Sequence, residues 1–474
     1  MRAAQPSSAG RSLRLAAVAA LLAGSACAEP AKEVPSPPDA ADAAQTAPAA
    51  PASAPAADGA AQPVAAGRDE KDVVLDTPTS PAGAPELLRT PVHDAANAAA
   101  LADLGLALLR AQAAAAGDAQ HNRVLSPYSV ANALALAHAA AAGETRSGIA
   151  SVLASRAAGD HFFLRGLPSL IAAMPAGADA ALASANRLWV AHAVAPAIAP
   201  PFASTLRERY RADAAVVDFG QPEAARAGIN QWVAERTAGK IDALLAKGAI
   251  SASTRLVLTN AVHFKSAWET PFDPARTAAA PFHLPDGKTV QVPTMRDTRN
   301  VRQGRIDNVT VYELPFAGAF SLLVGLPPPG HSLDALQKDL AGLDLASWSS
   351  QLEDERCELS LPRWKTEQPA FSLKDALQGL GMSTAFSPAA DFSGALGDAG
   401  KDLRLDDALH AATIVIDEAG GEATAATAIT AVAKSLAPPT KARQCAIDRP
   451  FLFAIVHQDT GVPVFVGTVA RPGE

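Results

Sequence analysis

The chain has 474 residues, 49% of them hydrophobic, and a formal net charge of −8 at pH 7. This length and apolar content allow a large buried core, and no Lys- and Arg-rich block interleaved with aromatic residues favours nucleic-acid binding. Three cysteines are too few for a disulfide-rich scaffold, and the sequence has no Cys-x-x-Cys or His-Glu-x-x-His motif. We therefore expect neither a metal nor a cofactor.

Residues 1–28 have the pattern of an export signal. Basic residues precede a short apolar segment, Leu15 to Leu22, which is too short to cross a bilayer. The small residues around Cys27 then allow two outcomes. Cleavage after Ala28 would release a soluble protein, whereas Gly24-Ser25-Ala26-Cys27 is similar to a bacterial lipobox and would leave Cys27 lipidated. Both predict an exported protein, extracellular or periplasmic, whose only membrane contact would be a lipid on Cys27.

Proline and alanine dominate from Ala28 to about Gly67, with hardly any aromatic or β-branched residue. Such a segment cannot bury enough apolar surface to fold and is expected to be an extended tether. We assign residues 29–88 to this tether and residues 89–474 to the folded domain.

Helix signals begin at the start of the folded domain. Asp94 is placed to cap a helix with a leucine-rich face. Ser126-Pro127 is typical of an N-cap followed by a first-turn proline, and opens a helix that extends to Ala142. Thr145 is a candidate cap for the next helix. Residues 229–240 predict an amphipathic helix that is closed by a glycine.

Strands are predicted between these helices and after them. The apolar run from Leu256 to Phe264 is typical of a central strand buried on both faces, and Asp286-Gly287 marks a tight hairpin. Because strands and helices are interspersed without a βαβ period, the fold class is α+β. The other predicted strands span residues 185–190, 312–315, 322–326, 359–364 and 409–418.

The segment from Asp417 to Ser435, D-E-A-G-G-E-A-T-A-A-T-A-I-T-A-V-A-K-S, is typical of neither a loop nor a buried strand. Alternate residues from Gly421 to Ala431 form a face small enough to slide between two packed strands, and the other face suits a partly wet surface. It predicts a segment that can be exposed or become a strand. The alternative is a low-complexity linker. The residues C-terminal to the segment weaken that alternative, because they comprise D-R-P-F-L-F and two apolar strands around Asp459-Thr460-Gly461, a hairpin signal.

In this order, the small-residue segment, D-R-P-F-L-F and the final hairpin resemble the serpin family of protease inhibitors. V-L-S-P-Y-S-V-A-N-A-L-A-L-A and A-G-E-T-R-S-G-I extend the resemblance colinearly over residues 90–472. It implies an α+β serpin fold with a large central mixed β-sheet, two smaller sheets, about eight to nine helices and an exposed reactive loop near the C-terminus. It also implies a monomer that is an inhibitor and not an enzyme. A target protease cleaves the loop, which inserts into the main sheet and traps the protease as a covalent acyl-enzyme.

The resemblance assigns the reactive loop residue by residue. It places the scissile bond at Lys434-Ser435, and a lysine there suits a trypsin-like serine protease, whose specificity pocket holds a carboxylate. The stretch from Leu436 to Gln444 is longer than usual, so Lys441 and Arg443 stay open as alternative cleavage points. The small residues and glycines of the hinge are Glu418, Gly420, Gly421, Glu422, Ala423, Thr424, Ala425, Ala426 and Thr427.

One hinge residue departs from the family pattern. Gly421 stands where the family usually has Thr or Ser, and the weak strand propensity of glycine would slow insertion without adding a clash. Proline, charge or bulk in the hinge, which would resist insertion, is absent, so an inhibitory member is favoured.

Other residues are carried over as structural. Trp268 matches the top of the main sheet, where insertion begins. Cys357 and Cys445 fall on neighbouring strands of a smaller sheet, so the resemblance and an exported compartment allow a disulfide; two separate buried thiols are the alternative. The polar cluster beneath the middle of the main sheet, where the strands part, is matched by Ser126, Ser129, Asn260 and His410.

Two other classes of function stay open. A non-inhibitory serpin acting as a binding or chaperone-like protein would have the same fold, and Gly421 and the long distal segment favour it. A hydrolase built from scattered Ser, His and Asp residues would need a nucleophile motif such as G-x-S-x-G, which the sequence lacks.

Overall fold

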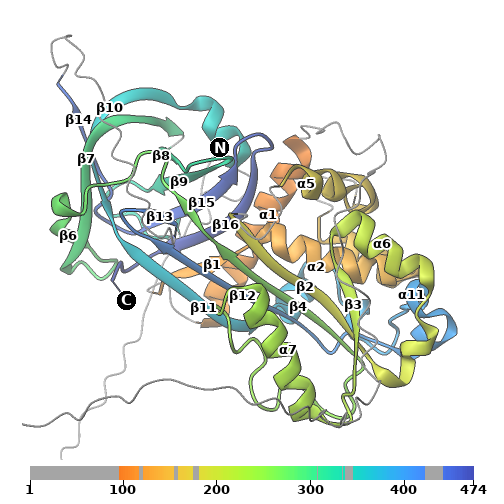
Figure 1. Cartoon of the computed structure of the whole chain (residues 1–474). Coiled ribbons are helices and arrows are strands. Elements are labelled where there is room, and N and C mark those ends of the chain that lie inside the picture. Colours follow the sequence, from red (N-terminus) through yellow and green to blue (C-terminus); the bar gives the residue numbers. More distant parts are fainter. Residues whose placement is uncertain are drawn as a thin grey trace, which may run out of the picture. The chain divides into compact units, whose positions relative to one another are not determined.

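Figure 1 shows the fold in a computed structural model of the chain. The export signal, the tether, Cys27, Lys434, Ser435 and hinge residues 422–427 lie outside the residues that the structure describes. Those described residues are 95–116, 121–153, 159–174, 181–306, 308–333, 335–336, 345–421 and 441–473.

The main sheet is mixed and has the strand order β3-β2-β4-β12-β13-β5, with β11 paired to β12. Strand β4 is antiparallel to β2 and parallel to β12, as expected for the large central sheet. Every residue of β4 is buried, as its apolar run predicts. The strands are β2 (Leu182–Ala191), β3 (Asp213–Val217), β4 (Leu256–Phe264), β5 (Ser266–Ala267), β11 (Trp364–Ser372), β12 (Asp407–Ile416) and β13 (Gly420–Gly421).

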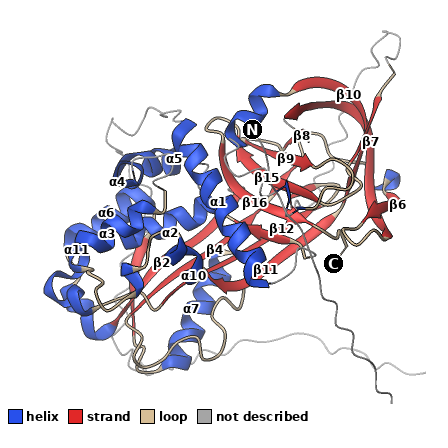
Figure 2. Ribbon diagram, turned by 180° about the vertical axis from the view of Figure 1, so that it is seen from behind, coloured by secondary structure: helices blue, strands red, loops and turns tan. Residues whose placement is uncertain are grey.

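The remaining strands form a nine-stranded sheet that curves around one end of the molecule's core, as Figure 2 shows for β7 and β10. Strand β7 pairs with β6 and β10 along most of its length and with β8 at its end, so the two smaller sheets of the expected fold share this strand. The strands are β1 (Arg123–Leu125), β6 (Ala278–His283), β7 (Thr289–Ile306), β8 (Val309–Pro315), β9 (Phe320–Leu326), β10 (Glu353–Pro362), β14 (Arg443–Ala446), β15 (Phe451–His457) and β16 (Val462–Val469).

Helices cover both faces of the main sheet: α2 packs on one face and α7 on the other (Figures 1 and 2). Trp232 of α7 meets Trp189 of β2 edge to face, with ring centroids 5.5 Å apart. The α-helices are α1 (Ala95–Ala116), α2 (Pro127–Ala140), α3 (Gly143–Ser151), α4 (Gly159–His161), α5 (Leu167–Ala173), α6 (Pro200–Tyr210), α7 (Pro222–Arg236), α9 (Leu345–Trp348), α10 (Lys374–Gly379) and α11 (Ser393–Leu396).

The helix starts agree with the sequence in one case and differ in another. Ser126 caps α2 as predicted, because its side chain accepts a hydrogen bond from the Ser129 amide at 3.0 Å. Thr145 does not cap α3, which begins at Gly143; its hydroxyl instead accepts from the Asp391 amide at 2.8 Å. Helix α1 is long and apolar enough to cross a membrane by length and composition, yet 56% of that stretch is buried in the protein.

Candidate functional site

The site is the seam between the two parallel strands of the main sheet, β4 and β12. They pair directly from Val257–Asp407 to His263–Thr413. Beyond this point β13 lies between them: Gly421 pairs with Ile416 of β12 on one side and with Ser266 of β5 on the other, antiparallel to both. The seam is therefore closed in its middle and opened at one end by the first residues of the small-residue segment.

A buried hydrogen-bond cluster lies under the closed part of the seam. The Nε2 of His410 accepts from the Ser126 amide at 3.1 Å, so its Nδ1 carries the proton that it donates to Oδ1 of Asn260. The Asn260 amide donates to the Ser129 carbonyl at 2.7 Å and to its hydroxyl at 2.6 Å. All four side chains named from the sequence are buried here and join helix α2 to both strands of the seam.

The sequence missed two members of this cluster, Asn186 and Ser184 of β2. Asn186 stands opposite Asn260 in the sheet; its carbonyl oxygen accepts from Asn260 and, at 3.3 Å, from Ser129. Its amide donates to Ser184 at 2.8 Å. The available clue was two polar residues at alternate positions in a strand otherwise predicted to be core.

Burial governs the charge of the histidine. Desolvation lowers the pKa of His410 from 6.5 to about 3, so the imidazole is neutral at physiological pH. A neutral ring is what the hydrogen bonds require, because one nitrogen accepts and the other donates.

This lowered pKa predicts an acid sensitivity. The unfolded chain binds a proton at His410 near pH 6.5 and the folded chain only near pH 3, so stability is complete above pH 6.5 and is lost as pH falls. The expected loss from this group is about 1.4 kcal/mol per pH unit below 6.5. Urea unfolding midpoints at pH 7, 6 and 5 should fall less steeply in His410→Gln than in the unsubstituted protein. Equal slopes would contradict the assignment.

Trp268 lies at the open end of the seam, against the start of the hinge. Its indole Nε1 donates to the Asp417 carbonyl at 2.8 Å, and its backbone amide donates to the Ala419 carbonyl at 2.9 Å. The ring stacks on Phe316 with centroids 4.4 Å apart and is almost fully buried. Trp268 thus fixes the chain where it leaves β12.

The carboxylate of Glu418 anchors the same turn. It accepts from the Thr277 hydroxyl at 2.6 Å and lies 3.4 Å from the Arg363 guanidinium. Burial opposes ionisation, but the Thr277 hydrogen bond and the Arg363 charge outweigh it and hold the pKa of Glu418 below its usual value. Because Arg363 is 47% exposed, the ion pair itself contributes little and the Thr277 contact is the firmer anchor.

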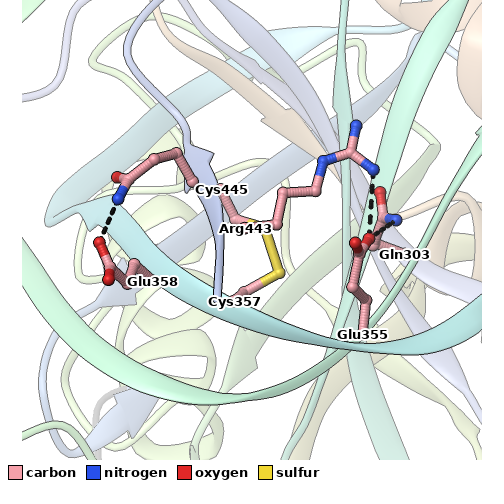
Figure 3. Close-up of a disulfide and its surroundings, with 7 residues drawn as sticks. Gln303, Glu355, Cys357, Glu358, Arg443 and Cys445 are labelled. Carbon is pink, nitrogen blue, oxygen red and sulfur yellow. Dashed lines mark hydrogen bonds and ion pairs between the residues drawn. A yellow bond between two sulfur atoms is a disulfide. The ribbon is translucent and has the colours of Figure 1, made fainter. Parts of the chain in front are cut away.

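The far end of the segment is fixed covalently. Figure 3 shows Cys357 of β10 bonded to Cys445 of β14 by a disulfide, with Cα atoms 5.6 Å apart. Strand β14 runs parallel to β10, and Arg443 adds an ion pair to Glu355 at 3.2 Å. Arg443 is therefore held in a strand ladder, which makes it a poor cleavage point, whereas the exposed Lys441 precedes the strand.

The remaining sequence assignments, Glu422 to Thr427, Lys434, Ser435 and Cys27, are outside the described residues. Within the described part of the chain, no group of three or more His, Cys, Asp or Glu side chains could hold a metal ion.

Comparisons with known proteins agree with this architecture. Residues 99–472 match the family model described as serpin (serine protease inhibitor). The chain is 32% identical to an uncharacterized serpin-like protein of Thermococcus kodakarensis, over 74% of this chain and 81% of that protein. It is 33% identical to the leukocyte elastase inhibitor of Bos taurus, over 74% of this chain and 93% of the relative.

Solved structures show the same fold. Tengpin, a thermophilic serpin in its native state, matches with a TM-score of 0.69 and 27% identity, covering 80% of this chain and 94% of tengpin. Thyroxine-binding globulin in complex with thyroxine matches with a TM-score of 0.69 and 26% identity, covering 80% and 99%. Fold and sequence define a protein of a class of protease inhibitors rather than enzymes. The chain belongs to the serpin family.

Proposed function

We propose that this protein is an inhibitory serpin, a suicide substrate for a trypsin-like serine protease that cleaves Lys434-Ser435. The observation that carries the proposal is the seam: β13 enters between β4 and β12, antiparallel to both, at the head of a segment of small residues. A segment that continues in this direction would run down the seam as a new strand.

The geometry supplies a driving force for insertion. The direct β4–β12 pairing is parallel, and a strand inserted between them replaces it with two antiparallel ladders. Antiparallel pairing is slightly more stable per residue, and twice as many backbone groups are paired. The uncleaved loop is held at both ends, by the docked hinge and by the disulfide-bonded β14, so cleavage is what frees it to insert.

The chemistry belongs to the protease. Its serine attacks the Lys434 carbonyl, an ester forms, and the amine of Ser435 leaves with a proton. The inhibitor then competes with hydrolysis of that ester: insertion draws the bound protease away and distorts its active site before water attacks. The His410–Asn260–Ser129 cluster must rearrange as the seam opens, which gives it a structural and not a catalytic role.

The test is incubation with trypsin followed by denaturing gel electrophoresis. A stable band heavier than either protein, with loss of trypsin activity, is the expected result. Clean cleavage with full residual activity would reject inhibition of trypsin. The alternative function, a non-inhibitory binding protein, is favoured by the likeness to thyroxine-binding globulin, which is solved with a bound ligand. It predicts loop cleavage without an adduct for every protease tried.

We also propose that the protein is exported, as residues 1–28 indicate. The Cys357–Cys445 disulfide supports this, since such bonds persist in oxidising compartments. A lipid on Cys27 is tested by cell fractionation of Cys27→Ser: lipidation predicts a shift from the membrane fraction to the soluble fraction, and an unchanged distribution contradicts it.

A further inference from the structure

The hinge is fixed to the sheet through its backbone before any cleavage. Four consecutive carbonyl groups, from Asp417 to Gly420, each accept a hydrogen bond of 2.8 to 3.0 Å, in order from Trp268 Nε1, the Phe272 amide, the Trp268 amide and the Asp417 amide. The Asp417 carboxylate also accepts from the amides of Ala419 and Gly420 at 2.8 and 3.2 Å. Such complete pairing identifies a docked turn and not an open loop.

Docking extends one residue further, to Gly421. This residue is buried and pairs with Ile416 on one side and with Ser266 on the other. It therefore already occupies the position of the first inserted residue.

Both glycines are required by their surroundings. Gly420 has φ +145°, and a Cβ there would lie 2.2 Å from the Ser266 carbonyl oxygen. A Cβ on Gly421 would lie 2.8 Å from two ring carbons of Phe264. That ring cannot move aside easily, because it is fully buried and packs edge to face at 5.0, 5.5 and 6.1 Å against Phe316, Phe320 and Phe465.

We propose that Gly421 is a positioning residue: it keeps the hinge docked in the main sheet before a protease binds, and Phe264 is the side chain that demands a glycine there. Its consequence for inhibition rests on the proposed function, because a docked hinge gives insertion a first step that is already formed. A side chain at 421 would shift the hinge out of the seam. Overpacking penalties of ordinary size correspond to a roughly 5- to 150-fold shift in that equilibrium.

The test is hydrogen exchange at the Trp268 and Phe272 amides of the uncleaved protein, since both donate to hinge carbonyls. Gly421→Ala should speed exchange at these amides by roughly 5- to 150-fold. The matched control is Gly228→Ala, because Gly228 lies on the exposed face of α7 and a Cβ there meets nothing within 4 Å. Adding Phe264→Val to Gly421→Ala removes both clashing ring carbons and should restore slower exchange than in Gly421→Ala alone.

Unchanged exchange in Gly421→Ala, or equally fast exchange in the unsubstituted protein, would overturn the proposal. No protease is present, so this result is independent of inhibition. Slow exchange that depends on Gly421, in a protein that forms no adduct with any protease, would reject the proposed function and retain the docked hinge. With trypsin, Gly421→Ala should also raise the number of inhibitor molecules consumed per protease inactivated.

Discussion

Lys434→Glu is expected to slow the inhibition of trypsin by a factor of about 1,000 or more, since like charges brought together at an interface cost several kcal/mol and each 1.4 kcal/mol is tenfold. The specificity pocket of a trypsin-like protease holds a carboxylate that a lysine satisfies and a glutamate opposes. The measurement is the second-order rate constant of trypsin inactivation.

The matched control is Lys441→Glu. It makes the same charge change in the exposed residues just before β14, and inhibition should be nearly unaffected. If Lys441→Glu abolishes inhibition and Lys434→Glu does not, the scissile bond comes after Lys441. Comparable loss in both variants would mean that charge around the loop, and not one bond, determines recognition.

Removing the disulfide is expected to destabilise the protein strongly. The bond links residues 88 positions apart, and closing a loop of that size in the unfolded chain is worth about 3 to 5 kcal/mol. The double substitution Cys357→Ser and Cys445→Ser should lower the urea unfolding midpoint accordingly. Unsubstituted protein treated with a reductant should give the same lower midpoint, and it serves as the control for the serine side chains. Midpoints that are insensitive to both changes would contradict this role.

The same bond determines how adducts must be analysed. Cleavage after Lys434 makes a C-terminal fragment of 474 − 434 = 40 residues, and Cys445 keeps it attached to Cys357. The fragment should therefore leave the adduct only on a reducing gel. Its mass then identifies the cleaved bond.

The sequence predicted those elements whose signals are local. The apolar run of β4, the Ser126-Pro127 start of α2 and the final hairpin result from burial, capping and turn chemistry that neighbouring residues determine by themselves. The family resemblance supplied the long-range pairs, such as Asn260 with His410, which no local pattern could give.

The features that the sequence missed depend on contacts between distant segments. Thr145 has the composition of a cap, but the Asp391 amide, far along the chain, takes its hydroxyl. Asn186 is an ordinary polar residue of a strand until its place opposite Asn260 is known. For Gly421, propensity alone suggested slower insertion, whereas the ring of Phe264 gives a steric reason for a glycine that only the fold reveals.

Strand insertion can be tested by comparing the thermal unfolding midpoint of the intact protein with that of protein cleaved in the loop and separated from the protease. If the freed segment inserts between β4 and β12, two antiparallel ladders replace one parallel ladder and the midpoint of the cleaved protein should rise clearly above that of the intact protein. A midpoint that is unchanged or lower after cleavage would mean that the segment stays outside the sheet, and would contradict inhibition by strand insertion.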